Sequence, residues 1–84
     1  MSVQLELELT ELFTKHSDLR LQAVRLIMLL EESAPVEQSE LAEGLGIEQY
    51  ELSRLLAKLE LHRYVVRERA GTDKMVSLRA ARSA

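Results

Sequence analysis

The stretch QSELAEGLGIEQYELSRLLAKLE, residues 38–60, has the spacing of two helices joined by a tight turn. Gly44 and Gly46 predict the turn, because glycine adopts the positive φ that a tight connection between helices needs. The second helix is expected over about residues 48–61, where one apolar stripe is formed by Leu52, Leu55, Leu56 and Leu59. The stretch therefore predicts a helix-turn-helix pair that packs on a shared core.

Elements on both sides of this pair complete a small domain. Upstream, residues 17–32 predict a long helix that is apolar around most of its circumference and is ended by Pro35. Val36 predicts a short edge strand. Downstream, residues 64–69 and 74–79 predict two strands joined by the turn AGTD. The predicted fold class is mainly α with a small β-hairpin, and three core helices, the hairpin and an extra N-terminal segment make up the chain.

The N-terminal segment, residues 1–16, fits two templates. Its apolar residues alternate as in a strand at Val3, Leu5, Leu7 and Leu9. They also lie on one helical face at Leu5, Leu9, Leu12 and Phe13. We favour a helix, because glutamate and leucine are good helix formers. The predicted organisation is this apolar segment, a domain over residues 17–79, and a short polar tail at residues 80–84 that frays.

The net charge of −3 is unevenly distributed. Residues 1–53 hold three Lys or Arg against eleven Asp or Glu, which gives −8. Residues 54–84 hold eight Lys or Arg against three acids, which gives +5. A phosphate backbone responds to the local field more than to the total charge. The basic C-terminal part is therefore compatible with a nucleic-acid partner.

Several kinds of site are excluded or unsupported. The chain has no cysteine, which excludes disulfides, thiolate zinc sites and thiol nucleophiles. His16 and His62 are far apart in sequence and predict no metal site. Because we find no phosphate-binding glycine loop and no Ser/His/Asp set, we expect no enzyme, no cofactor and no small-molecule substrate. The N-terminus has neither a basic signal region nor an apolar run of membrane length, so we expect a cytoplasmic protein without a membrane partner.

The order of the predicted elements resembles a winged helix-turn-helix. Residues 19–79 are most similar to the DNA-binding core of MarR-type bacterial regulators. ELAEGLGI resembles the first helix and turn of the motif, SRLLAKLE resembles the second half of its recognition helix, and YVVRERAGTDKMVSLR resembles its wing. The resemblance implies a sequence-specific DNA-binding transcriptional regulator. The 48–61 helix would enter the major groove, and the 64–79 hairpin would be the wing.

The resemblance also implies a set of DNA contacts on the helix and the wing. Arg54 would reach guanine with two hydrogen bonds or neutralise a phosphate, and Lys58 would hold the backbone. Tyr50 has two open interpretations, stacking on a base or sugar and packing on the protein itself. The wing cations would follow phosphates or reach the minor groove. The implied DNA-binding residues are Gln49, Tyr50, Ser53, Arg54, Lys58, Arg67, Arg69 and Lys74.

Three features depart from the family pattern. Glu48 and Glu51 stand where the family commonly has hydroxyl or basic residues. A glutamate near phosphate lowers affinity, although it can accept a hydrogen bond from cytosine N4. Arg63 takes a turn position where the family often has glycine. The MarR type continues after the wing into helices that build its dimer, so we do not expect the family's own dimer and effector pocket here.

The expected partners are double-stranded DNA and a second copy of the chain. Seventeen leucines exceed what one small core covers, which predicts a homodimer through residues 3–30. The alternative is a winged-helix protein–protein interaction module in a larger assembly, without DNA binding. In that case Arg54 and the wing would dock an acidic protein, and Glu48 and Glu51 would contact it. A third interpretation is a pure oligomerisation subunit.

Overall fold

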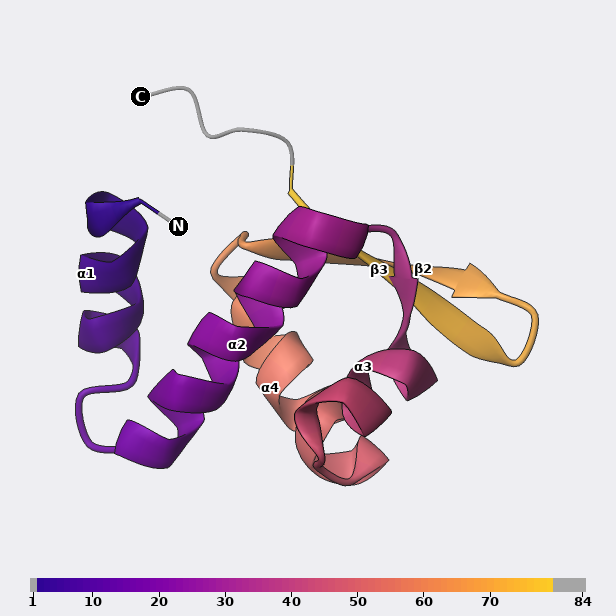
Figure 1. The fold of residues 1–84 in the computed structure, drawn as a ribbon, viewed down its shortest axis with the longest axis horizontal. Helices are drawn as coiled ribbons and strands as arrows, with labels where there is room; N and C mark the ends of the chain where they lie inside the picture. Colours follow the sequence, from indigo (N-terminus) through magenta and orange to yellow (C-terminus); the bar gives the residue numbers. More distant parts are fainter. Residues whose placement is uncertain (1, 80–84) are drawn as a thin grey trace.

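Four helices and a small antiparallel sheet make up the fold in a computed structural model that describes residues 2–79 (Figure 1). The predicted class, mainly α with a β-hairpin in a winged helix-turn-helix, is confirmed. The prediction of a frayed tail at residues 80–84 falls outside the described residues. The elements are α1 (Val3–Leu12), α2 (Ser17–Ser33), β1 (Val36–Glu37), α3 (Gln38–Leu45), α4 (Gln49–Leu61), β2 (Val65–Ala70) and β3 (Asp73–Leu78).

The sheet has the order β1-β3-β2, so β3 is its central strand. The short strand predicted at Val36 is present, and this residue pairs with Val76 at the edge of the sheet. In the hairpin, the pairing of Ala70 with Asp73 leaves only Gly71 and Thr72 in the turn. The connection is therefore shorter than the predicted four residues. Gly71 has a φ of 64°, as tight two-residue hairpin turns require.

The turn between α3 and α4 depends on one of its two glycines. Gly46 ends α3 in the left-handed region with a φ of 67°. Its N–H donates to the carbonyl of Glu43 at 3.2 Å, and the N–H of Ile47 donates to that of Ala42 at 3.1 Å. These bonds satisfy carbonyls that the helix end leaves free. Gly44 lies inside α3 and needs no special backbone conformation.

The core combines residues from all four helices and from the hairpin. The helical interpretation of residues 3–13 is confirmed and the strand interpretation is wrong, because Val3–Leu12 form a helix. Leu9 of this helix and Phe13, which follows it, are buried in the core. Only one side of α1 therefore packs against the core, and Leu7 on its other side is exposed. The buried apolar residues are Leu9, Phe13, Ala23, Leu26, Ile27, Leu30, Leu41, Ala42, Leu45, Leu52, Leu55, Leu56, Leu59, Val65 and Val76.

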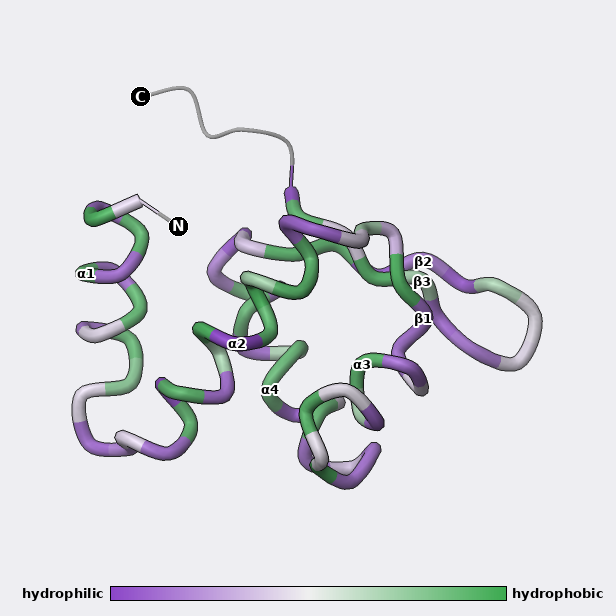
Figure 2. The backbone as a smooth tube through the Cα atoms, viewed as in Figure 1, coloured by the Kyte–Doolittle hydropathy of each residue, from purple (hydrophilic) through white to green (hydrophobic). Residues whose placement is uncertain are grey.

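A second group of apolar side chains remains exposed on α1 and α2. Val3 and Leu7 lie on the outer side of α1, and Leu21 and Met28 lie on the outer side of α2. Figure 2 shows hydrophobic and hydrophilic segments alternating along both helices, as expected where only one face is covered. Most of the large apolar side chains that remain exposed within residues 2–79 therefore lie on these two helices.

The connection from α4 to β2 contains a non-glycine residue with positive φ. Arg63 has a φ of 66° and an exposed side chain. A left-handed conformation costs a residue with a Cβ about 1–2 kcal/mol, and a glycine loses part of this gain through its more flexible unfolded chain. We expect Arg63→Gly to raise the free energy of unfolding by about 0.5–1 kcal/mol in urea denaturation. Equal stability of Arg63→Gly and Arg63→Ala would contradict this.

Candidate nucleic-acid interface

The outward face of α4 presents an aromatic residue and a cation. Four leucines of α4 are buried, whereas Gln49, Tyr50 and Arg54 are exposed. The Cζ atom of Arg54 lies 5.8 Å from the centroid of the Tyr50 ring, one helical turn away. Tyr50 therefore contacts Arg54, its neighbour on the same face of α4. Because 69% of Tyr50 is exposed, its ring remains accessible for stacking.

The hairpin carries its cations on one face. Arg67 is opposite Val76, and Arg69 is opposite Lys74. Side chains two residues apart in a strand point to the same side, so these residues share a face. Val65 and Val76 on this face are buried against the helices, whereas Arg69 and Lys74 are exposed near the tip. The tip projects beyond the helices, at the end of the molecule opposite α1 (Figure 1).

Arg69 and Lys74 are directly opposite each other in the hairpin. Like charges in a cross-strand pair repel and destabilise the sheet. Both side chains are exposed, so solvent screens the repulsion in the free protein. An anion placed between them would remove it. The tip of the hairpin is thus suited to contact a phosphate.

Arg67 differs from its neighbours because it contacts the helices. Its side chain is only 12% exposed, and Nη2 donates to Oε1 of Glu60 at 3.1 Å. Nη1 lies 3.4 Å from Oε1 of Gln38 and 3.4 Å from Oγ of Ser53. Two predicted DNA contacts, Arg67 and Ser53, therefore face each other inside the protein. Both side chains lie where the hairpin packs against α4.

Lys58 also makes a contact within the chain. Its Nζ atom lies 4.9 Å from the centroid of the Phe13 ring, and its side chain is half-buried. This contact borders a hollow between α4 and the connection from α1 to α2. The hollow is lined by Phe13, His16, Leu19, Glu51, Arg54, Leu55 and Lys58. Of the five predicted cations, Arg54, Arg69 and Lys74 are thus exposed on α4 and the wing, and Lys58 and Arg67 are partly enclosed.

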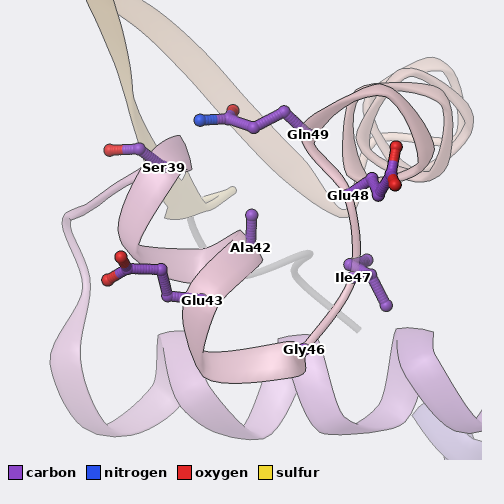
Figure 3. Close-up of a pocket in the computed structure, with 7 residues that line it drawn as sticks. All are labelled: Ser39, Ala42, Glu43, Gly46, Ile47, Glu48 and Gln49. Carbon is purple, nitrogen blue, oxygen red and sulfur yellow. The ribbon is translucent and has the colours of Figure 1, made fainter.

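The acidic residues at the front of α4 are exposed. Glu48 is the N-cap residue and makes no side-chain capping bond, and Glu51 follows in the first turn. Glu48 borders a shallow hollow between α3 and α4, together with Glu43 (Figure 3). Figure 3 shows the two carboxylates directed away from each other, with the Ala42 methyl group between α3 and α4. Within residues 2–79, no group of three or more His, Cys, Asp or Glu side chains could hold a metal ion.

Four residues that join the hairpin to α3 and α4 were not predicted as functional. Gln38 and Glu60 bind Arg67, as described above. At the other strand of the hairpin, the Ser39 hydroxyl donates to Asp73, and the Lys74 N–H donates to Asp73 at 2.7 Å. These bonds hold the pKa of Asp73 below its ordinary value, with the Ser39 bond as the largest cause. No local signal marks such pairs, because Ser39 and Asp73 are 34 residues apart.

The Ser39 bond to Asp73 predicts an acid-dependent change. Because its pKa is lower in the folded state, the Asp73 carboxylate stabilises the fold at neutral pH. This contribution is lost as the pH falls through the folded-state pKa. We expect Ser39→Ala to raise the pKa of Asp73 towards its ordinary value and so to reduce this acid-dependent contribution to stability. Carboxyl NMR titration checks this, and Ser77→Ala is the control. An unchanged Asp73 titration in Ser39→Ala would contradict the bond.

A helix-turn-helix followed by a β-hairpin on a three-stranded sheet defines a winged helix-turn-helix protein. The model of the MarR family matches residues 17–74, and the chain belongs to this family. α1 precedes the matched residues. A search of curated proteins found no match to the chain. MarR proteins are winged-helix regulators of transcription. No helix within residues 2–79 combines the length and apolar character needed to span a bilayer.

Proposed function

We propose that the protein binds double-stranded DNA sequence-specifically and regulates transcription. α4 enters the major groove, and the β2–β3 hairpin acts as the wing. One observation carries this proposal: Arg54 is exposed on the outward face of α4, and Arg69 and Lys74 are exposed on the helix-facing side of the hairpin. A recognition helix and a wing with free cations give contacts to bases and to phosphates.

The charge distribution supports one orientation on DNA. α1 carries three glutamates and lies at the end of the molecule opposite the hairpin tip (Figure 1). Repulsion between phosphates and the acidic N-terminal part would turn the hairpin and α4 towards DNA. Among the exposed residues at the front of α4, Gln49 can form two hydrogen bonds with adenine. Glu48 or Glu51 can accept a hydrogen bond from cytosine N4. Arg54 supplies the contact to guanine or phosphate.

The proposal includes a homodimer formed through α1 and α2. Leu21 and Met28 are about half exposed on one side of α2, with Val24 between them, and Val3 and Leu7 are exposed on α1. Two copies would present α4 to successive major grooves, about 34–36 Å apart. Light scattering after size exclusion is expected to give twice the chain mass of 9.6 kDa at micromolar concentration. A Leu21→Asp/Met28→Asp variant is expected to be a monomer. A monomeric unmodified chain would exclude this dimer.

A second candidate function is favoured by a specific feature of α4. Its outward face continues from Arg54 to Ala57 and Leu61, and 77% of Leu61 is exposed. An aromatic residue, an arginine and a leucine in one stripe suit a protein interface. In this case the winged helix would dock an acidic protein and would not bind DNA.

Salt dependence separates the two candidate functions. DNA binding releases counterions, so affinity for genomic fragments should fall steeply between two salt concentrations, and a polyanion should compete. A protein partner held by the apolar stripe would remain bound at moderate salt. A mobility shift with genomic fragments at both salt concentrations is the experiment. No shift at low salt would overturn the DNA-binding proposal.

A further inference from the structure

We propose that Arg67 is a positioning residue that fixes the angle between the wing and α4. Its effect on DNA affinity rests on the proposed function, whereas its effect on the wing is a property of the free protein. Among residues 2–79, the ion pair with Glu60 is the salt bridge that joins the hairpin to α4. The same guanidinium reaches α3 through Gln38.

The contacts of Arg67 join three elements at one point. Glu60 and Ser53 are seven residues apart on α4, so they lie on the same helical face two turns apart. Arg67 lies between them, and Gln38, which is 8% exposed, closes the third side. A guanidinium can donate in several fixed directions of one plane, which a lysine ammonium on a flexible stem cannot reproduce. The arrangement resists rotation of the hairpin in more than one direction.

The wing needs such a contact because its tip is unsupported. Val65 and Val76 anchor the base of the hairpin in the core, and Arg69 and Lys74 follow beyond Arg67. From Arg67 to the last residue of β2 the strand extends about 10 Å, at roughly 3.3 Å per residue. A small rotation at Arg67 is therefore enlarged at the two cations. The reach of these cations to phosphate then depends on Arg67, whose own side chain is 12% exposed and paired with Glu60.

The angle can be measured without DNA. Because the chain has no cysteine, spin labels at Thr72→Cys in the hairpin turn and Ala57→Cys on α4 form a unique pair. We expect pulsed EPR to give one narrow distance distribution. Arg67→Met should broaden or displace it, whereas Arg69→Met, on the same strand and face, should leave it unchanged. An unchanged distribution in folded Arg67→Met protein would overturn the proposal.

Two further variants keep the test decisive. Glu60→Gln removes only the charged partner, which is 42% exposed, and is expected to broaden the distribution less than Arg67→Met. This variant replaces Arg67→Met if the latter does not fold. Ser39→Ala removes the hydrogen bond from α3 to Asp73 on β3. If Ser39→Ala alone broadens the distribution and both Arg67→Met and Glu60→Gln do not, the positioning role belongs to Asp73 and the assignment to Arg67 is wrong.

DNA affinity gives a readout that lost stability alone would not change. In the unmodified protein, Lys74→Ala should weaken DNA binding, because it removes a phosphate contact. If Arg67 positions the wing, the loss of affinity caused by Lys74→Ala should be smaller in the Arg67→Met background by more than about twofold, because the effects of independent sites add to within about that factor. A full Lys74→Ala effect in that background would overturn the proposal. Absence of DNA binding by the unmodified protein would instead overturn the proposed function and leave the EPR test standing.

Discussion

Leu9→Ala is expected to lower the free energy of unfolding by about 2–5 kcal/mol. Leu9 is completely buried in α1, and its removal leaves a cavity between α1 and the rest of the core. A domain of this length has a total stability of about 4–13 kcal/mol, so the variant loses a large part of it. Urea denaturation followed by circular dichroism gives the difference.

The control for Leu9→Ala is Leu7→Ala on the same helix. Leu7 is 55% exposed, so the same atoms are removed from the surface and the change should stay within about 0.5 kcal/mol. Both variants are measured at a concentration at which the protein is monomeric, because association would add to the apparent stability. Equal effects of the two substitutions would mean that α1 does not pack as described.

Arg54→Ala is expected to reduce specific DNA affinity by about 1–3 kcal/mol, which is the value of a good contact to a base edge. Arg54 is exposed on the outward face of α4, where its guanidinium lies over the Tyr50 ring. Fluorescence anisotropy with a selected operator and with a scrambled duplex measures both affinity and preference. Arg20→Ala on α2 is the control with the same change in charge. Unchanged operator binding by Arg54→Ala would contradict the proposal that α4 enters the major groove.

The helices and the turn could be predicted because their signals are local. Leu52, Leu55, Leu56 and Leu59 recur at helical spacing, and all four are buried. Gly46 has the positive φ that a turn between helices needs. The hairpin followed from alternation around a Gly-containing turn. The N-terminal segment was ambiguous, since its leucines satisfied two periods, and the packing of Leu9 and Phe13 against the core decides for a helix.

The sequence could not predict which candidate site residues are exposed and which contact other elements, because this depends on contacts between segments that are distant in the chain. The strand period places Arg67, Arg69 and Lys74 on one face, but it does not show that Arg67 reaches Glu60 and Gln38. Likewise, the helical period of α4 does not show that Lys58 lies over the Phe13 ring. No local sequence pattern distinguishes Lys58 and Arg67 from the exposed Arg54. The difference in exposure arises from the packing of the α1 region and the hairpin against α4.

The central claim is that α4 and the wing form the surface that binds DNA, and a matched pair of double variants tests it most directly. Arg54→Ala/Lys74→Ala removes one exposed cation from α4 and one from the wing. Arg20→Ala/Arg79→Ala removes one from α2 and one from the residue that follows β3, away from the tip, with the same change in net charge. Anisotropy titrations at one salt concentration should show a large loss of affinity for the first variant and near-normal binding for the second. Equal losses in both variants, or normal binding by the first, would contradict the claim.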